Sequence, residues 1–172
     1  NNITHLDNLP PGLETLECSV NKITHLDYLP ITLENLICNN NQITQLDNLP
    51  PNIKLLYCYS NKITHLNNLP DSITHCECYS NGILEMNNLP SKLERLDCSN
   101  NNLTYLNNLP RKLVELHCFN NNIIQIDTLP KTLTTLICYN NDIEDIDFLP
   151  ESIMYLDSRS NPFCSGLIDY FT

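Results

Sequence analysis

The sequence predicts a right-handed solenoid in which 20-residue coils stack to form one parallel β-sheet. Three columns of residues that recur every 20 positions support this prediction. The first is the proline of a Leu-Pro pair, at Pro10, Pro30, Pro50, Pro70, Pro90, Pro110, Pro130 and Pro150. The second is asparagine, at Asn1, Asn21, Asn41, Asn61, Asn81, Asn101, Asn121, Asn141 and Asn161. The third is cysteine, at Cys18, Cys38, Cys58, Cys78, Cys98, Cys118 and Cys138, and it ends at Ser158.

Each repeat is expected to supply one slice of an apolar core. Leu33, Leu36 and Cys38 can point inward from a short strand, and Ile43 and Leu46 can point back from the far side of the coil. Because a single slice cannot bury both of its faces, it must stack on its neighbours. The strands are expected to start near Leu13, Leu33, Ile53, Ile73, Leu93, Leu113, Leu133 and Ile153.

The return path of each coil is expected to contain few or no helices. A period of 20 residues leaves little room once the strand and its turns are subtracted. Each proline also holds the preceding leucine in extended or polyproline II geometry. A helix is wider than the strand spacing, so a thin extended convex wall predicts a comparatively flat member of the α/β horseshoe class.

The repeat, L-x-x-L-x-C-x-x-N-x-I-x-x-L-x-x-L-P-x-x, resembles leucine-rich repeats of the short 20-residue class. Similar repeats occur in bacterial type III effector proteins and in Asn-rich, Cys-bearing arrays of giant DNA viruses and amoebae. Effector repeats usually carry a second proline where this chain has Asp27, Asp47 or Asn67, and an aliphatic residue where it has Cys38. The viral or amoebal type is closer on both counts. The resemblance covers almost the whole chain and implies protein binding in the cytosol of a cell or host.

We divide the chain into a repeat array and a divergent end. Residues 1–157 form the array of about eight units, which starts in mid-unit without a polar cap. Residues 158–172 abandon the repeat pattern and are expected to form the last unit or a C-terminal cap. Because terminal units normally need capping, the uncapped start either continues a missing segment or packs against another copy.

Charge and composition exclude several classes of partner. Acidic residues outnumber basic ones 20 to 9, which gives a formal net charge of -11. Such a surface repels phosphate backbones, so neither nucleic acid nor an anionic membrane is an expected partner. No apolar run approaches the roughly 20 residues that span a bilayer, and the first residues show no signal-peptide pattern.

The cysteine column is interpreted as a structural ladder of buried thiols. In-register strands hold their Cβ atoms farther apart than a relaxed disulfide needs, and a column spreads the thiols along a line that does not suit a tetrahedral zinc site. A metal or redox role is the alternative. Unpaired thiols favour a reducing compartment and hence a cytoplasmic location. Cys164 lies outside the column, so the repeat does not predict its burial.

The asparagine column is interpreted as a second structural ladder. The chain leaves the strand there, and a buried amide can both donate to and accept from backbone groups that have lost their sheet partners. We therefore assign Asn21, Asn41, Asn61, Asn81, Asn101, Asn121 and Asn141 to structure rather than to a ligand site.

The outward, concave face of the sheet is the candidate binding surface, because the repeat leaves its residues free to vary. Aromatic residues make up only 7% of the chain, yet they gather on this face. The candidate partner-binding residues are Tyr57, Tyr59, His75, Tyr79, His117, Phe119, Ile137, Tyr139 and Tyr155. Large rings on a rigid sheet are common anchors of protein interfaces. Acidic neighbours such as Glu77 and Asp97 predict a partner with a basic rim. The alternative is that in-register rings only stabilise the sheet.

The sequence predicts a non-catalytic protein-interaction module. No motif pairs a nucleophile with a base, and no residue pattern indicates a cofactor or a metal. Two alternatives remain open. The array can be the substrate-recruiting part of a longer enzyme, such as a ubiquitin-ligase effector, or an element that assembles end to end through its uncapped ends.

Overall fold

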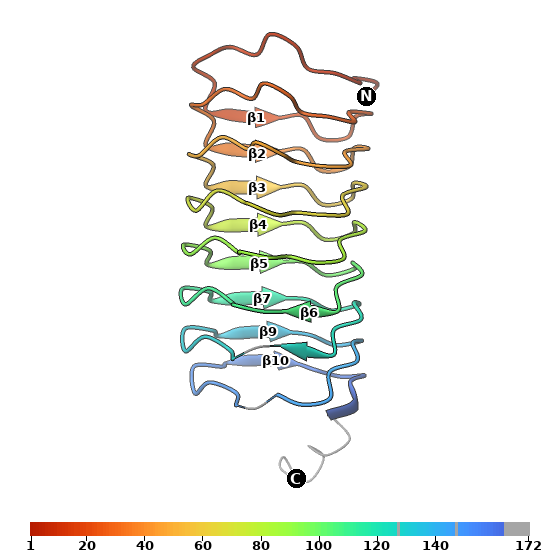
Figure 1. Ribbon diagram of the computed structural model, residues 1–172, viewed down its shortest axis with the longest axis vertical. Helices are drawn as coiled ribbons and strands as arrows, with labels where there is room; N and C mark the ends of the chain where they lie inside the picture. Colours follow the sequence, from red (N-terminus) through yellow and green to blue (C-terminus); the bar gives the residue numbers. More distant parts are fainter. Residues whose placement is uncertain (127, 147, 164–172) are drawn as a thin grey trace.

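The computed structural model describes residues 1–126, 128–146 and 148–163. The described chain winds into a single stack of coils with a β-strand on one side and an extended segment on the other (Figure 1). This arrangement confirms the predicted solenoid of short parallel strands. Much of the expected C-terminal cap, with Cys164, falls on positions 164–172 and lies outside the described residues.

The main sheet has eight parallel strands in the order β1-β2-β3-β4-β5-β7-β9-β10. They are β1 (Thr15–Glu17), β2 (Asn35–Ile37), β3 (Leu55–Tyr57), β4 (His75–Glu77), β5 (Arg95–Asp97), β7 (Glu115–His117), β9 (Thr135–Ile137) and β10 (Tyr155–Asp157). Neighbours pair one repeat apart, so that Leu36 lies beside Leu56 and Leu56 beside Cys76. In β1 to β5, β7 and β9 the middle side chain is buried, and its two neighbours point outward.

The strands begin two residues later than predicted. In the first full coil the strand starts at Thr15, whereas the sequence suggested Leu13. The reason is a tight turn after the proline, in which the Leu13 amide donates to the Pro10 carbonyl over 3.1 Å. The same bond recurs from the Leu33 amide to the Pro30 carbonyl at 3.0 Å. The leucine at this position therefore closes the turn, and sheet pairing begins two residues later.

The convex side is extended, and no α-helix occurs in the described part of the chain. Two short strands pair there in parallel, β6 (Tyr105–Leu106) and β8 (Gln125–Ile126), and His65 and Glu85 form an isolated bridge. This convex pairing was not predicted. Because no helix separates successive return segments, their backbones approach closely enough to bond, as where the Leu84 amide donates to the Thr64 carbonyl over 3.2 Å.

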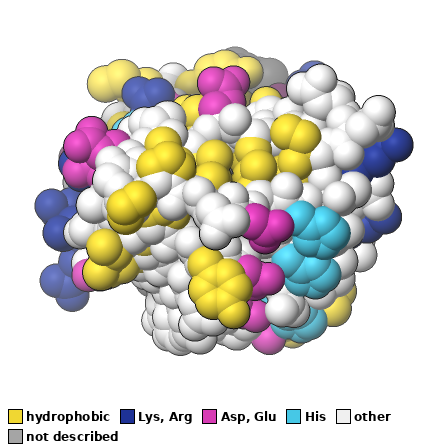
Figure 2. All heavy atoms as spheres, turned by 90° about the horizontal axis from the view of Figure 1, so that it is seen from above, with side chains coloured by type: hydrophobic (Ala, Val, Ile, Leu, Met, Phe, Trp, Pro, Cys, Tyr) yellow, Lys and Arg dark blue, Asp and Glu magenta, His cyan; other side chains and the backbone are white. Residues whose placement is uncertain are grey.

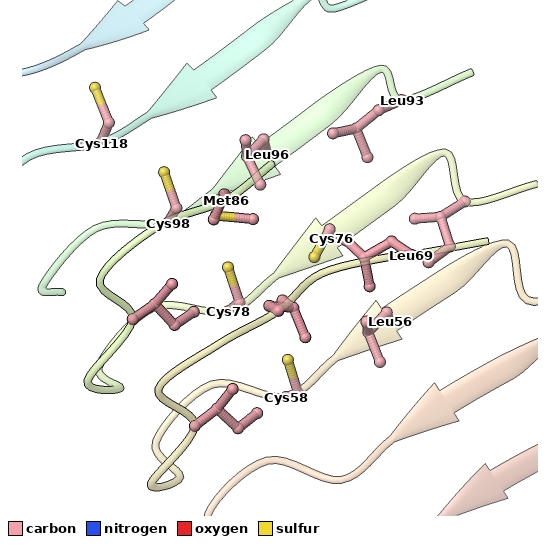
Figure 3. Packing of buried hydrophobic residues seen from close by; sticks show 14 of the residues in the cluster. Leu56, Cys58, Leu69, Cys76, Cys78, Met86, Leu93, Leu96, Cys98 and Cys118 are labelled. Atoms are coloured by element: carbon pink, nitrogen blue, oxygen red, sulfur yellow. The ribbon is translucent and has the colours of Figure 1, made fainter. Parts of the chain in front are cut away.

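Apolar side chains from both walls meet in one core that runs along the stack. Leu36, Cys38 and Ile43, from one coil, are each fully buried. Figure 3 shows the cysteines of successive coils in a row, from Cys58 to Cys118, among leucine and methionine side chains. Cys76 stands in the inward leucine position of its strand and is also buried.

The described cysteines are all buried, at Cys18, Cys38, Cys58, Cys76, Cys78, Cys98, Cys118 and Cys138. Burial raises the pKa of the Cys18 thiol to about 11. It also raises the pKa of the Cys58 and Cys98 thiols well above the ordinary value, with neighbouring groups adding to the shift. Since the thiolate is the reactive form, these thiols are held in the unreactive state at neutral pH.

The asparagine ladder joins consecutive coils through its side-chain amides. The Nδ2 of Asn101 donates to the carbonyls of Cys78, Cys98 and Ser99 at 3.0 to 3.1 Å. Its Oδ1 accepts from the Ile83 amide of the preceding coil at 3.0 Å. The donation to the preceding coil recurs at Asn41, Asn61, Asn81, Asn121, Asn141 and Asn161. One side chain per coil therefore satisfies backbone groups on both sides of an interface between coils.

Left-handed backbone geometry recurs twice in most coils. One such position precedes the ladder asparagine and is filled by Asn40, Ser60 and their equivalents, and the other lies near the convex turn, as at Asn48. Asparagine adopts this geometry at lower cost than most residues. Serine replaces asparagine at Ser60, Ser80 and Ser160, and larger side chains occur at Val20 and Tyr28, both with φ of 56°. A β-branched side chain is disfavoured in that region, so Val20 is a point of strain.

The N-terminal end of the stack exposes part of the core. Seen along the axis, apolar side chains lie across the middle of this end, with many of the charged side chains toward its margin (Figure 2). Ile3 is 43% exposed, whereas its equivalents Ile23 and Ile43 are fully buried. The contrast shows that burial of each apolar layer requires a neighbouring coil to cover it.

Replacing Asn101 with alanine should lower the free energy of unfolding by about 2 to 3 kcal/mol, because the Ile83 amide and the carbonyls around it would lose their partner inside the stack. Chemical denaturation followed by circular dichroism measures the change. The matched control is Asn102→Ala, which removes an exposed asparagine next in sequence. Equal losses for the two variants would contradict the bridging role of the ladder.

Replacing Val20 with asparagine should raise the free energy of unfolding by about 1 kcal/mol, because asparagine relieves the left-handed strain at an exposed site. The reciprocal change, Asn40→Val, places valine in the same geometry one coil later and should cost a similar amount. Both shifts are read from denaturation midpoints. A Val20→Asn chain with unchanged or reduced stability would rule out strain at this position.

Candidate protein interface

The candidate interface is the concave face, meaning the outward side chains of the main sheet and of the residue two positions beyond each strand. Strand alternation places Tyr57, His75, His117, Ile137 and Tyr155 on this face. Just beyond their strands lie Tyr59, Tyr79, Phe119 and Tyr139. Eight of these nine side chains are half-buried, and Tyr155, on the last strand, is 54% exposed.

Two aromatic stacks run along the concave face in the column beyond the strands. Tyr59 and Tyr79 stack with ring centroids 4.3 Å apart and planes 7° from parallel. Phe119 and Tyr139 stack at 4.6 Å and 11°. Because the strands pair in register, equivalent side chains on neighbouring coils are held near the strand spacing, which suits ring stacking. The sequence brings these four residues together as two pairs rather than as one continuous row.

A serine interrupts the aromatic column. Ser99 lies between Tyr79 and Phe119 in the repeat and is 1% exposed. Its hydroxyl and its backbone amide both donate to Oδ1 of Asp97, the amide over 3.0 Å. The interruption separates the two stacks and fixes the orientation of a carboxylate between them.

An ionic cluster lies on strands β3, β4, β5 and β7, beside the column of stacked rings. His117 Nδ1 lies 3.6 Å from Asp97 Oδ2, and Arg95 Nε lies 3.6 Å from Glu115 Oε2. Together with Glu77, His75 and Tyr57 these side chains line a shallow hollow of about 160 Å³. The strands in the middle of the concave face therefore carry polar and charged side chains, and the stacked rings lie in a column along one edge of them.

The charges in this cluster depend on one another. The polar contact with Asp97 raises the pKa of His117 above its ordinary value, although burial opposes the shift. Burial also opposes ionisation of Asp97, but the contact with His117 and the hydrogen bonds from Ser99 lower its pKa below the usual value. Burial and the neighbouring Asp97 raise the pKa of Glu77. The arrangement favours a protonated His117 beside an ionised Asp97.

Two phenols of this face, those of Tyr57 and Tyr79, are held in their neutral form. Burial raises the pKa of Tyr79 to about 12, with Tyr59 and nearby carboxylates adding to the shift. Burial also raises the pKa of Tyr57, with Glu77 contributing. These tyrosines therefore present neutral rings and hydroxyl groups rather than phenolates near neutral pH.

Arg159 belongs to the concave face, although the sequence placed it in the divergent end. Its guanidinium pairs with Asp157 through two hydrogen bonds, of 2.8 Å from Nε and 2.7 Å from Nη2. It also lies 5.7 Å from the centroid of the Tyr139 ring, which extends the second stack by one planar group. The sequence could have predicted this placement, because Arg159 lies one repeat after Tyr139 in the same column. Arg95 was also missed, although it lies in the same column as His75.

The described residues offer no group of three or more histidine, cysteine or acidic side chains placed to hold a metal ion. No helix in the described ranges is long and apolar enough to cross a membrane. The concave face presents rings, carboxylates, imidazoles and the guanidinium groups of Arg95 and Arg159, which are groups suited to non-covalent contacts.

The chain is similar in structure to bacterial leucine-rich-repeat proteins. It matches YopM from Yersinia enterocolitica at 35% identity and a TM-score of 0.91, over 94% of this chain and 36% of that one. A functional domain of InlJ from Listeria monocytogenes, described as including a cysteine ladder, matches at 34% identity and a TM-score of 0.82, over 94% of this chain and 38% of that one. A Shigella effector repeat domain matches at 26% identity and 0.71, over 87% of this chain and 70% of that one.

The chain thus spans well under half the length of the YopM and InlJ structures. No protein-family model matches the sequence, and no curated protein matches it. The structural matches and the shared architecture agree with the period, the parallel strands and the absence of α-helix in the described residues. The chain is a leucine-rich-repeat protein of the short 20-residue class, similar to those of bacterial effectors.

Proposed function

We propose that the chain is a non-catalytic protein-interaction module that binds a partner protein on its concave face in the cytosol. The observation that carries the proposal is the pair of aromatic stacks, Tyr59 with Tyr79 and Phe119 with Tyr139, which lie beside a charged cluster on a rigid sheet. Leucine-rich-repeat folds of this kind generally serve as protein-interaction modules, which supports the class of function.

The aromatic stacks supply anchors of the kind that concentrate binding energy. Tyrosine and phenylalanine bury large areas while losing little rotamer freedom, and a ring already packed against its neighbour loses even less. Because the rings stand on in-register strands, their spacing is set by the backbone and does not have to be arranged upon binding. A partner therefore meets a preorganised surface.

The charge distribution supports a partner with basic residues. Two carboxylates are already matched by cations: Glu34, just before β2, pairs with Lys54 at 2.8 Å, and Asp157 on the concave face pairs with Arg159 at 2.7 Å. In the central hollow Glu77, Asp97 and Glu115 face only one guanidinium and two imidazoles. With a net charge of -11 over the chain, a complementary rim would be positive.

Replacing Tyr59, Tyr79 and Tyr139 together with alanine should reduce capture of partner proteins from cytosolic lysate by at least about tenfold, since each ring is a candidate anchor. Immobilised wild-type and variant chains are compared by quantitative mass spectrometry. The same variant should keep its circular dichroism spectrum and unfold cooperatively, because the core beneath the strands is unchanged.

The matched control replaces Tyr28 and Tyr105, which are 99% and 48% exposed on other faces, with alanine. Its capture profile should equal that of the wild type. If the concave variant retains its partners, or the control loses them, the concave face is not the binding surface. If the concave variant unfolds, the stacked rings have the structural role instead, and the assignment fails.

A further inference from the structure

Asn81 is the ladder asparagine that glycine follows. The residues after the other ladder asparagines are Lys22, Gln42, Lys62, Asn102, Asn122, Asp142 and Pro162. An asparagine followed by glycine is the sequence most prone to spontaneous deamidation, because glycine offers no Cβ to hinder the attack. We infer that Asn81-Gly82 is a site of spontaneous deamidation. The folded stack prevents the reaction, and local opening of the coil permits it.

The reaction needs only water and a solvent base. The Gly82 backbone nitrogen loses its proton to the base and attacks Cγ of Asn81, and the side-chain amide leaves as ammonia. The product is a cyclic succinimide. Water then opens the ring at one carbonyl or the other, which gives aspartate or isoaspartate at this position. No change of oxidation state occurs.

In the folded chain both reacting groups are engaged. The Gly82 amide donates to the Ile63 carbonyl over 2.9 Å, so its nitrogen is oriented toward the preceding coil. Oδ1 of Asn81 accepts from the Ile63 amide at 2.9 Å, and Nδ2 donates to the carbonyls of Cys58 and Cys78 at 3.1 and 3.0 Å. Ring closure requires the Asn81 side chain to turn away from these partners. The attack therefore has to wait until the coil opens.

Opening of this coil is costly because it lies inside the stack. Asn81 follows β4, which pairs with β3 on one side and β5 on the other. In a solenoid the opening of an internal coil breaks an interface on each side, whereas a terminal coil breaks one. The deamidation rate of the folded chain should therefore report how often the middle of the array opens.

The products do not fit the ladder. An aspartate has no Nδ2, so its carboxylate would face the carbonyl oxygens of Cys58 and Cys78 in place of a donor. Isoaspartate in addition lengthens the backbone at a point where every neighbouring coil has the same length. Either product should weaken the middle of the stack, so that an opening event long enough for the reaction becomes irreversible damage.

Gly82 provides a matched variant. Its backbone has no positive φ, and a Cβ built there would meet the Ile63 carbonyl oxygen and Thr64 Cγ2 at 3.7 Å, which is ordinary contact. Gly82→Ala should therefore fold as the wild type does while hindering the cyclisation. The variant therefore changes the rate of deamidation without changing the stability of the coil.

The test compares native and denatured chains at mildly alkaline pH, with peptide mapping by mass spectrometry to locate aspartate and isoaspartate. Asn81 should deamidate at least about tenfold faster in denaturant than in the native state, because protection follows local opening. In denaturant it should be the first asparagine to react, and Gly82→Ala should slow the denatured-state rate by about tenfold while leaving the thermal midpoint unchanged.

A second variant measures the consequence. Asn81→Asp should unfold at lower denaturant concentration than the wild type. Three outcomes would each overturn the inference: equal rates in the native and denatured chains, earlier reaction at another asparagine in denaturant, or a denatured Gly82→Ala chain that reacts as fast as the wild type. An Asn81→Asp chain as stable as the wild type would overturn the proposed damage.

Discussion

The structure depends on burial of each slice of side chains between two neighbouring slices. A coil such as the one that contains Leu36, Cys38 and Ile43 has no hydrophobic interior of its own, because its apolar groups lie in one flat layer. The layer becomes a core only when another layer covers it. Ile3, which no further coil covers, is exposed, whereas its equivalent Ile23 is buried.

The asparagine ladder makes that stacking compatible with the backbone. Where the chain turns out of the sheet, carbonyls and amides would otherwise be left without partners inside the protein. Each ladder amide bonds to carbonyls of two coils, as Asn101 does at Cys78 and Cys98, so an interface between coils is both apolar and satisfied. The thiol ladder therefore contributes to the apolar packing between coils, and the amide ladder satisfies the backbone groups at the same interfaces.

The period explains why so much of the fold could be predicted from the sequence. A column that holds cysteine or asparagine in nearly every repeat predicts a side chain that points into the stack. The constant repeat length predicts the register of the sheet. The strand starts and the convex pairs β6 and β8 could not be predicted, because they depend on turn hydrogen bonds and on close backbone approach rather than on the pattern of apolar residues.

The concave face was predictable in outline and not in detail. Alternation along a strand places residues such as Tyr57 and His117 outward, and the common register brings Tyr59 next to Tyr79. The contacts of Arg159 with Asp157 and Tyr139, and those of His117 with Asp97, depend on side-chain rotamers that the repeat does not fix. The same freedom lets this face vary while the core remains constant.

Thiol accessibility tests the shared interior most directly. The native chain and the chain in denaturant are treated with a maleimide, and each cysteine is assigned by peptide mapping. The ladder cysteines from Cys38 to Cys138 should react only after unfolding, because their side chains lie in the core and the thiolate is disfavoured there. Rapid labelling of these cysteines in the native chain would contradict the account.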